Sequence, residues 1–283
     1  IASDISASST FEINSVNSSL RRVWFGSQYA NYVKDLARTE SQMAESSRVL
    51  TTGKKINTLG DDPIGVASSL RMKRLLAGIE QYDKNLHAAK GQLGYAENAL
   101  AEVQTLMRRA YELSVSAANS TTSQEGRVAM AAEVSEIQKR IMDLGNTMGP
   151  NGSYLFAGQQ TTTKPFTIDA SGLVYNGDDA NTLVEISPNT TMAINTQGRQ
   201  LFMDAYASLT NLKNSLEGGN LAELGGPVLE SLQAQDKAVG NVRATIGAKI
   251  KTVEEQSTNH TRRKDELTEL ISNVEDADMS EAI

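Results

Sequence analysis

The chain has 283 residues, of which 39% are hydrophobic, and this is enough to build a sizeable buried core. Its 34 acidic and 27 basic side chains give a formal net charge of −7, which argues against broad nucleic-acid binding because phosphates would be repelled. The sequence has no cysteine, and its two histidines, His87 and His260, lie in separate segments, so disulfides, thiolate metal sites and cysteine nucleophiles are excluded.

The N-terminal region shows two different patterns. Residues 1–21 are rich in serine and show no periodicity, so we expect a flexible leader or a remnant of an expression tag. We find neither a secretory signal nor an apolar run long enough to cross a bilayer, and we expect no membrane insertion. Residues 22–50 are predicted as a helix that pairs with the C-terminal helix, because three apolar residues recur at seven-residue intervals: Leu36, Met43 and Leu50.

A turn that begins at Gly53 separates this helix from a second one. Gly53 suits the C-terminal cap of the first helix because glycine adopts the left-handed conformation without strain. Asp62 can cap the start of the second helix, and Pro63 fits its first position, where no backbone N–H is needed. The adjacent carboxylates of Asp61 and Asp62 would also suit a metal ion, but the alternating oxygen ligands of a calcium loop are absent, so we favour the capping role.

The second helix is predicted to be long. Apolar or small residues recur in steps of three and four from Met72 to Ala110, the pattern of a helix buried along one stripe. From Met72 to Ala117 such a helix would be about 69 Å long, too long for a compact globule. Five glycines lie inside predicted helices and indicate either close helix approach and bending or simple tolerance: Gly78, Gly91, Gly94, Gly240 and Gly247.

The spacing of apolar residues changes in the middle of the chain. After a break at residues 119–123, apolar residues from Val128 to Met148 predict another helix, closed by Gly149. Over residues 153–196 we expect a small inserted β domain, because short runs rich in β-branched and aromatic residues alternate with turn formers: SYLFAG, PFTIDA, GLVYNGDD, NTLVEISP and TMAIN. Helical spacing then resumes from Leu201 up to Gly218.

The C-terminal segment has the clearest heptad pattern. Six residues besides His260 occupy its positions at seven-residue intervals: Leu232, Val239, Ile246, Val253, Leu267 and Val274. A polar residue such as His260 at a heptad core position more often fixes helix register than performs chemistry. We expect it to be buried neutral, unless an acidic partner such as Glu80 or Asp83 faces it and forms a charge pair.

The predicted fold is mainly α: a long, rod-like antiparallel helical bundle of coiled-coil character with a small inserted β domain. Residues 51–152 and 197–283 would form a discontinuous helical rod domain, 153–196 the β insertion and 22–50 the paired N-terminal helix. The C-terminal helix would pack against residues 72–117 and, at its end, against the N-terminal helix.

Three segments resemble one known family. LTTGKKINTLGDDPIGVASSLRMK (50–73) resembles the N-terminal signature of the flagellin and hook-associated proteins of bacterial flagella, including its turn at Gly53, Asp61, Asp62 and Pro63. NGSYLFAGQQTTTKPF (151–166) is similar to the hook–filament junction proteins of that family, and VRATIGAKI…ELISNVEDADMSEAI (242–283) to its C-terminal signature. Family members usually begin near the position of Arg22 and continue past the C-terminal motif with an amphipathic helix, so we expect foreign residues upstream and a missing terminal segment.

The resemblance implies a structural subunit that joins the flagellar hook to the filament. It implies self-association in the axial structure through paired terminal helices, contacts with a neighbouring hook-associated protein and with flagellin, and a location outside the cell. It further implies an export chaperone and passage through the flagellar type III apparatus.

Alternatives within and outside this class remain. The chain resembles filament flagellins as well, and a flagellin-like surface protein or adhesin would use the 153–196 insertion to bind carbohydrate. An enzyme is the least supported reading, because neither a G-x-S-x-G elbow nor an H-x-x-x-H pair occurs, and we expect no catalytic residue, metal or cofactor.

Overall fold

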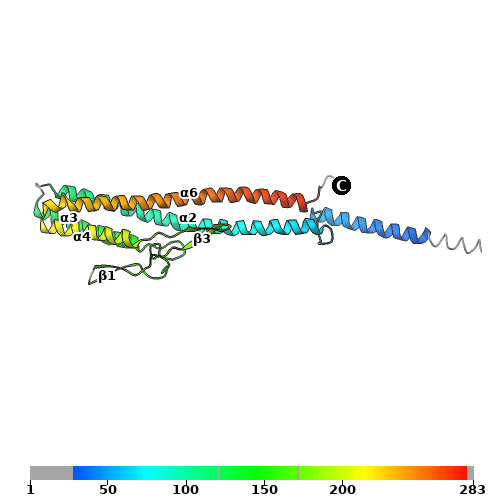
Figure 1. Cartoon of the computed structure of the whole chain (residues 1–283), viewed down its shortest axis with the longest axis horizontal. Coiled ribbons are helices and arrows are strands. Elements are labelled where there is room, and N and C mark those ends of the chain that lie inside the picture. Colours follow the sequence, from blue (N-terminus) through cyan, green and yellow to red (C-terminus); the bar gives the residue numbers. More distant parts are fainter. Residues whose placement is uncertain (1–27, 120–121, 171, 279–283) are drawn as a thin grey trace, which may run out of the picture. The chain divides into compact units, whose positions relative to one another are not determined.

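The computed structural model describes residues 28–119, 122–170 and 172–278. The predicted leader, residues 1–21, and the first part of the predicted helix 22–50 lie outside the described residues. The chain is mainly helical, with two long helices packed antiparallel and two small two-stranded sheets, as predicted (Figure 1). It divides into two compact units, one from residues up to Arg74 together with those from Leu267 onward, the other from residues 75–266.

The first unit contains a helix over residues 28–52, the start of α2 (Pro63–Ala117) and the end of α6 (Pro227–Glu275). The helix over 28–52 ends at Gly53, which adopts the predicted left-handed conformation with φ 69° and donates its N–H to the carbonyl of Val49 at 2.8 Å. Because a side chain at this φ is strained, glycine is the residue that ends the helix here.

The second unit is built on α2 and α6, which lie side by side and antiparallel (Figure 1). Cross-helix ion pairs show this direction: Glu97 pairs with Arg243, whereas Arg108, further along α2, pairs with Asp236, earlier in α6. The predicted stripe of α2 is buried from Leu86 onward, including Leu93, Leu100 and Met107, whereas Leu75 near its predicted start is exposed. The long-helix prediction is therefore confirmed for both partners.

Three shorter helices complete this unit: α3 (Gln124–Gly145), α4 (Arg199–Gly218) and α5 (Leu221–Leu224). α3 packs against α4, and the buried residues of α2, α3, α4 and α6 form one hydrophobic cluster. α3 was predicted to continue to Gly149 but ends at Gly145. The reason is Asn146, whose side-chain amide and carbonyl hydrogen-bond the backbone C=O and N–H of Phe166, both at 2.9 Å, and so direct the chain into the β insertion.

The insertion contains two antiparallel hairpins, β1 (Phe166–Asp169) with β2 (Gly172–Tyr175) and β3 (Leu183–Ser187) with β4 (Thr190–Ala193). The prediction that SYLFAG forms a strand was wrong: residues 153–158 form turns and an isolated bridge. Gly158 at φ 69° interrupts the extended conformation, and a Cβ there would overlap the backbone of Asp178. The apolar run instead buries Phe156 against Phe202, with ring centroids 4.9 Å apart.

None of the described helices combines the length and the apolar character needed to span a membrane.

The helical glycines give a first prediction. A Cβ at Gly94 in α2 meets no atom within 4 Å, so Gly94→Ala should raise the free energy of unfolding by about 1 kcal/mol, the helix-propensity difference. A Cβ at Gly145 would lie 2.7 Å from the ring of Phe166, so Gly145→Ala should lower stability. Denaturant melts of both variants check this; a destabilised Gly94→Ala would show that helix approach, and not tolerance, explains this glycine.

Candidate functional site

The signature turn and the C-terminal signature meet at one buried carboxylate in the first unit. Glu275, at the end of α6, is 8% exposed. Its Oε2 accepts a hydrogen bond from Lys54 Nζ at 2.7 Å, and its Oε1 accepts hydrogen bonds from Ser69 Oγ and Lys73 Nζ. We call these four residues the Glu275 cluster. Lys54 comes from the turn after Gly53, and Ser69 and Lys73 lie one turn apart on α2, so three separate segments supply its members.

Backbone bonds hold the same segments together. Residues Lys54 and Asp276 form an antiparallel bridge, the N–H of Lys55 donates to the carbonyl of Glu275 at 2.8 Å, and the N–H of Ala277 donates to that of Gly53 at 2.9 Å. The turn and the C-terminal segment therefore pair like two short strands, and this pairing places Lys54 next to Glu275.

The electrostatics of the cluster favour the charged pair. Hydrogen bonds from Lys54, Lys73 and Ser69 lower the pKa of Glu275 to about 2, although burial acts in the opposite direction. The hydrogen bond from Lys54 to Glu275 and the negative charge of that carboxylate raise the pKa of Lys54. A carboxylate buried with three donors is stable only when all of them are in place.

The signature turn is organised by its two aspartates. The carboxylate of Asp61 accepts from the N–H groups of Asn57 and Thr58 at 2.8 and 2.7 Å and from the Thr58 hydroxyl at 2.7 Å, and these bonds, the hydroxyl first, lower the pKa of Asp61 to about 2. Asp62 Oδ1 accepts from the N–H groups of Ile64 and Gly65 at 3.1 and 2.9 Å. The predicted cap is thus confirmed, with Pro63 in the first helical position.

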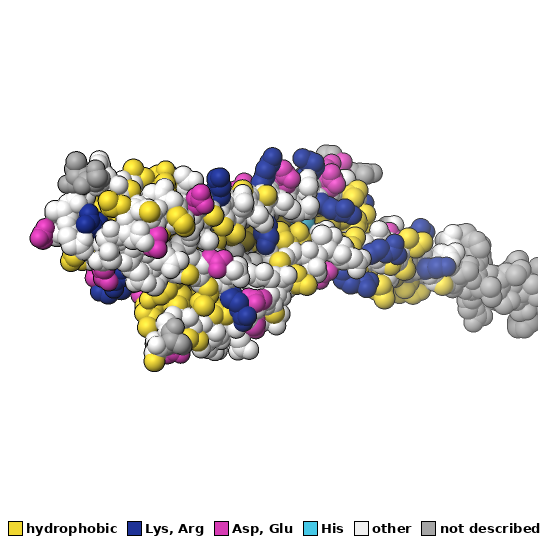
Figure 2. Space-filling model, turned by 60° about the vertical axis from the view of Figure 1, so that its left-hand side comes forward, with side chains coloured by type: hydrophobic (Ala, Val, Ile, Leu, Met, Phe, Trp, Pro, Cys, Tyr) yellow, Lys and Arg dark blue, Asp and Glu magenta, His cyan; other side chains and the backbone are white. Residues whose placement is uncertain are grey.

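The apolar stripe of the N-terminal helix faces solvent in the described chain. Leu36, Met43 and Leu50 are 49%, 69% and 43% exposed, so the expected contact of these side chains with the C-terminal helix is not made. Figure 2 shows hydrophobic side chains between Lys and Arg side chains along this helix, at the right of the view. The pairing therefore stays a prediction for the assembled state.

The heptad positions of α6 lie on its buried face. Five of the apolar ones are buried and Val274 is half-buried; the buried ones are Leu232, Val239, Ile246, Val253 and Leu267. His260 is also buried, and its Nδ1 lies 3.2 Å from Oδ1 of Asp83 on α2. Asp83 Oδ2 lies 3.8 Å from Lys264 Nζ. His260 is therefore buried as expected, and Asp83 is the acidic partner that the alternative expectation named.

A second polar contact in the seam between α2 and α6 had no signal in the sequence. Arg243 donates from Nε and Nη2 to Oε1 of Glu97 at 3.0 and 2.6 Å. It also donates from Nη1 to Oε1 of Gln104 at 2.5 Å. These side chains belong to no heptad position, and their pairing appears only once the two helices are in register. Polar contacts of this kind penalise any shift of one helix along the other.

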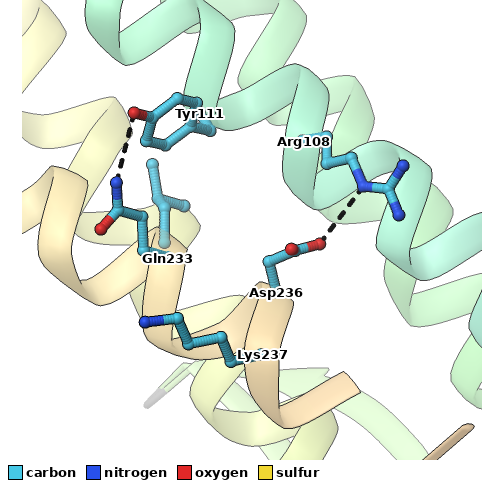
Figure 3. A pocket seen from close by; sticks show the side chains of 6 residues that line it. Arg108, Tyr111, Gln233, Asp236 and Lys237 are labelled. Atoms are coloured by element: carbon cyan, nitrogen blue, oxygen red, sulfur yellow. Dashed lines mark hydrogen bonds and ion pairs between the residues drawn. The ribbon is translucent and has the colours of Figure 1, made fainter. Parts of the chain in front are cut away.

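A small pocket lies in the seam between α2 and α6 (Figure 3). That pocket has a volume of about 200 Å³, below the 300 Å³ or more of usual ligand sites. Four of its polar side chains are already paired: Gln233 Nε2 donates to the Tyr111 hydroxyl at 3.2 Å, and Arg108 Nε donates to Asp236 at 3.5 Å. Among the described residues no cluster of three potential metal ligands occurs.

Comparisons with known proteins find similar chains among bacterial flagellar proteins. Residues 27–161 match the bacterial flagellin N-terminal helical region. The flagellar hook-associated protein 3 of Escherichia coli K12 is 24% identical over 282 residues, which cover 90% of this chain and 88% of that protein. Residues 27–161 thus resemble bacterial flagellins, and the chain resembles a hook-associated protein along nine-tenths of its length.

A flagellin and a solved hook-associated protein also resemble the chain. A flagellin of Bacillus subtilis is 26% identical over 261 residues, covering 88% of this chain and 85% of the flagellin. A flagellar hook-associated protein from Vibrio parahaemolyticus has the same fold, with a TM-score of 0.71 and 19% identity over 76% of this chain and 100% of the solved one. All three of these similar proteins are flagellar proteins by name.

The Glu275 cluster gives a second prediction. Glu275→Gln should lower the protection of the Lys55 and Ala277 amides against hydrogen exchange about tenfold or more at pH 7, because charge-assisted hydrogen bonds are lost. Since the pKa of Glu275 is lowered in the folded state, the stabilisation is present above the ordinary pKa of 4.5 and is lost as the pH falls towards about 2.

The difference in amide protection between the wild type and Glu275→Gln should therefore become smaller as the pH falls from 4.5 towards 2. Glu269→Gln, an exposed change on the same helix, is the matched control and should leave both amides unchanged. Equal amide protection in the wild type and in Glu275→Gln at pH 7 would show that the cluster does not stabilise this unit.

Proposed function

We propose that this chain is a hook-associated protein of the bacterial flagellum that forms the junction between hook and filament. The observation that carries the proposal is the likeness to hook-associated protein 3 along nine-tenths of the chain. The chain is then an extracellular structural subunit that works by assembly, and the absence of a predicted catalytic group fits that role.

The assembly surface is the apolar stripe of the N-terminal helix. Leu36, Met43 and Leu50 are exposed on a helix that ends at the Gly53 turn, and the Glu275 cluster ties that turn to the end of α6. An exposed apolar stripe is stabilised by a helical partner. In the assembled flagellum this partner is the paired terminal helix of the axial structure, and the neighbouring subunits are another hook-associated protein on the hook side and flagellin on the filament side.

Export is the second part of the proposal. A chain without cysteine suits passage through the flagellar type III apparatus as an unfolded polypeptide. An export chaperone would cover the apolar stripe of residues 36–50 before assembly, because an exposed stripe of this kind otherwise self-associates.

Filament flagellin is the second candidate, favoured by the 26% identity to the flagellin of Bacillus subtilis. Immunogold labelling of isolated flagella separates the two functions. A junction protein gives a single narrow band of label where hook meets filament, and deletion of its gene leaves hooks without filaments and flagellin in the medium. Label distributed along the filament would establish flagellin and overturn the junction assignment.

The stripe gives a third prediction. Leu36→Asp and Met43→Asp should leave the melting temperature of the isolated protein nearly unchanged, because both side chains are exposed, but should abolish incorporation at the junction, since assembly would bury an unpaired carboxylate. Swimming assays and immunogold labelling measure incorporation. Glu40→Gln, an exposed change on the same helix, should preserve motility. Normal motility of the Met43→Asp strain would show that the stripe is not the assembly surface.

A further inference from the structure

A polar cavity in the second unit is used by no part of the proposed assembly. It has a volume of about 370 Å³ and lies between α6 and the segments that flank the β3–β4 hairpin. The hairpin side is lined by Asn181, Asn195, Thr196 and Gln197, and the helix side by Val242, Thr245, Ile246 and Lys249. Val242, Ile246 and Lys249 follow one another at helical spacing, so an apolar wall and a cation share one face of α6.

Thr196 contributes a polar group without a partner. The residue is 9% exposed, and its Oγ1 is buried and makes no hydrogen bond with any described residue. Other polar groups of this wall are already satisfied: Asn195 donates to the carbonyl of Ala180 at 2.7 Å and accepts from the N–H of Thr182 at 3.0 Å, and Gln197 donates to the carbonyl of Asp179 at 2.8 Å. A buried hydroxyl without a partner costs free energy that a ligand oxygen can recover.

Lys249 contributes a half-buried cation. Burial lowers the pKa of its ammonium group, and no carboxylate opposes this shift. Within the part of the chain that the structure describes, no acidic oxygen lies within ion-pair distance of Lys249, whereas Lys251, two residues further along, lies 3.9 Å from Glu255. Asp179, on the hairpin side, pairs with Arg199 at 3.3 Å. A desolvated ammonium without a counterion favours an anion.

We propose that this cavity binds an aliphatic carboxylate. The carboxylate accepts hydrogen bonds from Lys249 Nζ and from the Thr196 hydroxyl, and its hydrocarbon part contacts Val242 and Ile246. Thr196 lines this cavity, so its unpartnered hydroxyl is the donor on the hairpin side. A single cation beside an apolar wall matches one carboxylate on a short hydrocarbon stem better than it matches a phosphate. The ligand is a free small acid or an acidic side chain of a neighbouring subunit, the latter resting on the proposed assembly.

Butyrate is the probe, and butyramide, of the same shape without the charge, is its control. NMR titration of the full chain should show saturable binding of butyrate and a raised pKa of the Lys249 ammonium in the complex, with no binding of butyramide. Lys249→Met and Thr196→Val should each weaken butyrate binding about tenfold, the value of one charge-assisted hydrogen bond. Lys251→Met, an exposed change on the same helix, should leave binding unchanged.

Thr196→Val should weaken butyrate binding but stabilise the free protein, and this stabilisation shows that the variant is folded. It removes the unsatisfied hydroxyl without changing the shape of the side chain, so it should raise the melting temperature of the free protein while reducing the further rise caused by butyrate. Equal binding of butyrate and butyramide, or unchanged butyrate affinity in both cavity variants, would overturn the proposal.

The titration repeated on protein assembled on isolated hooks identifies the source of the carboxylate. Unchanged butyrate binding after assembly indicates a free acid, and displacement of butyrate on assembly indicates a carboxylate of the neighbouring subunit. Either result retains the carboxylate site, whose existence is decided by the titration of the free chain and is independent of the junction assignment.

Discussion

The first unit depends on one buried carboxylate, that of Glu275. Taking a carboxylate out of water is costly unless donors replace its hydration, and here Lys54, Ser69 and Lys73 supply them. The side chains of Lys54 and Lys73 are 44% and 46% exposed, so screening by solvent limits each ion pair to about 1 kcal/mol. Because the donors come from the Gly53 turn and from α2, and the acceptor from α6, the cluster couples the stability of these three segments.

The second unit is stabilised differently, by an apolar seam between α2 and α6. Burial of leucine, valine and isoleucine supplies the free energy but does not by itself select one register. The polar contacts of Arg243 with Glu97 and of His260 with Asp83 select it, because any shift would leave partly buried polar groups without partners. A seam with a single register suits a subunit of an axial structure, in which the position of each surface must repeat from copy to copy.

Helix lengths, caps and the heptad face could be predicted from the sequence because each follows from neighbours within a few residues. Asp62, Pro63 and Gly53 act through the backbone next to them, and Val239 and Ile246 act through helical spacing. Glu275 could not be found in this way, since its partner Lys54 is 221 positions away and neither residue breaks a local pattern. The SYLFAG segment was wrongly predicted as a strand because a buried strand and a buried turn can have the same run of apolar residues. Gly158, which has a positive φ, was the residue that indicated a turn.

The central claim is that the Gly53 turn and the end of α6 are joined by the direct interaction of Lys54 with Glu275. A double-mutant cycle of Lys54→Met and Glu275→Gln, followed by hydrogen exchange of the Ala277 amide, measures this interaction without the separate contributions of Ser69 and Lys73. The account predicts a coupling free energy of about 1 kcal/mol or more, so that the double variant loses less protection than the two single variants together. Strict additivity of the two single effects would contradict it.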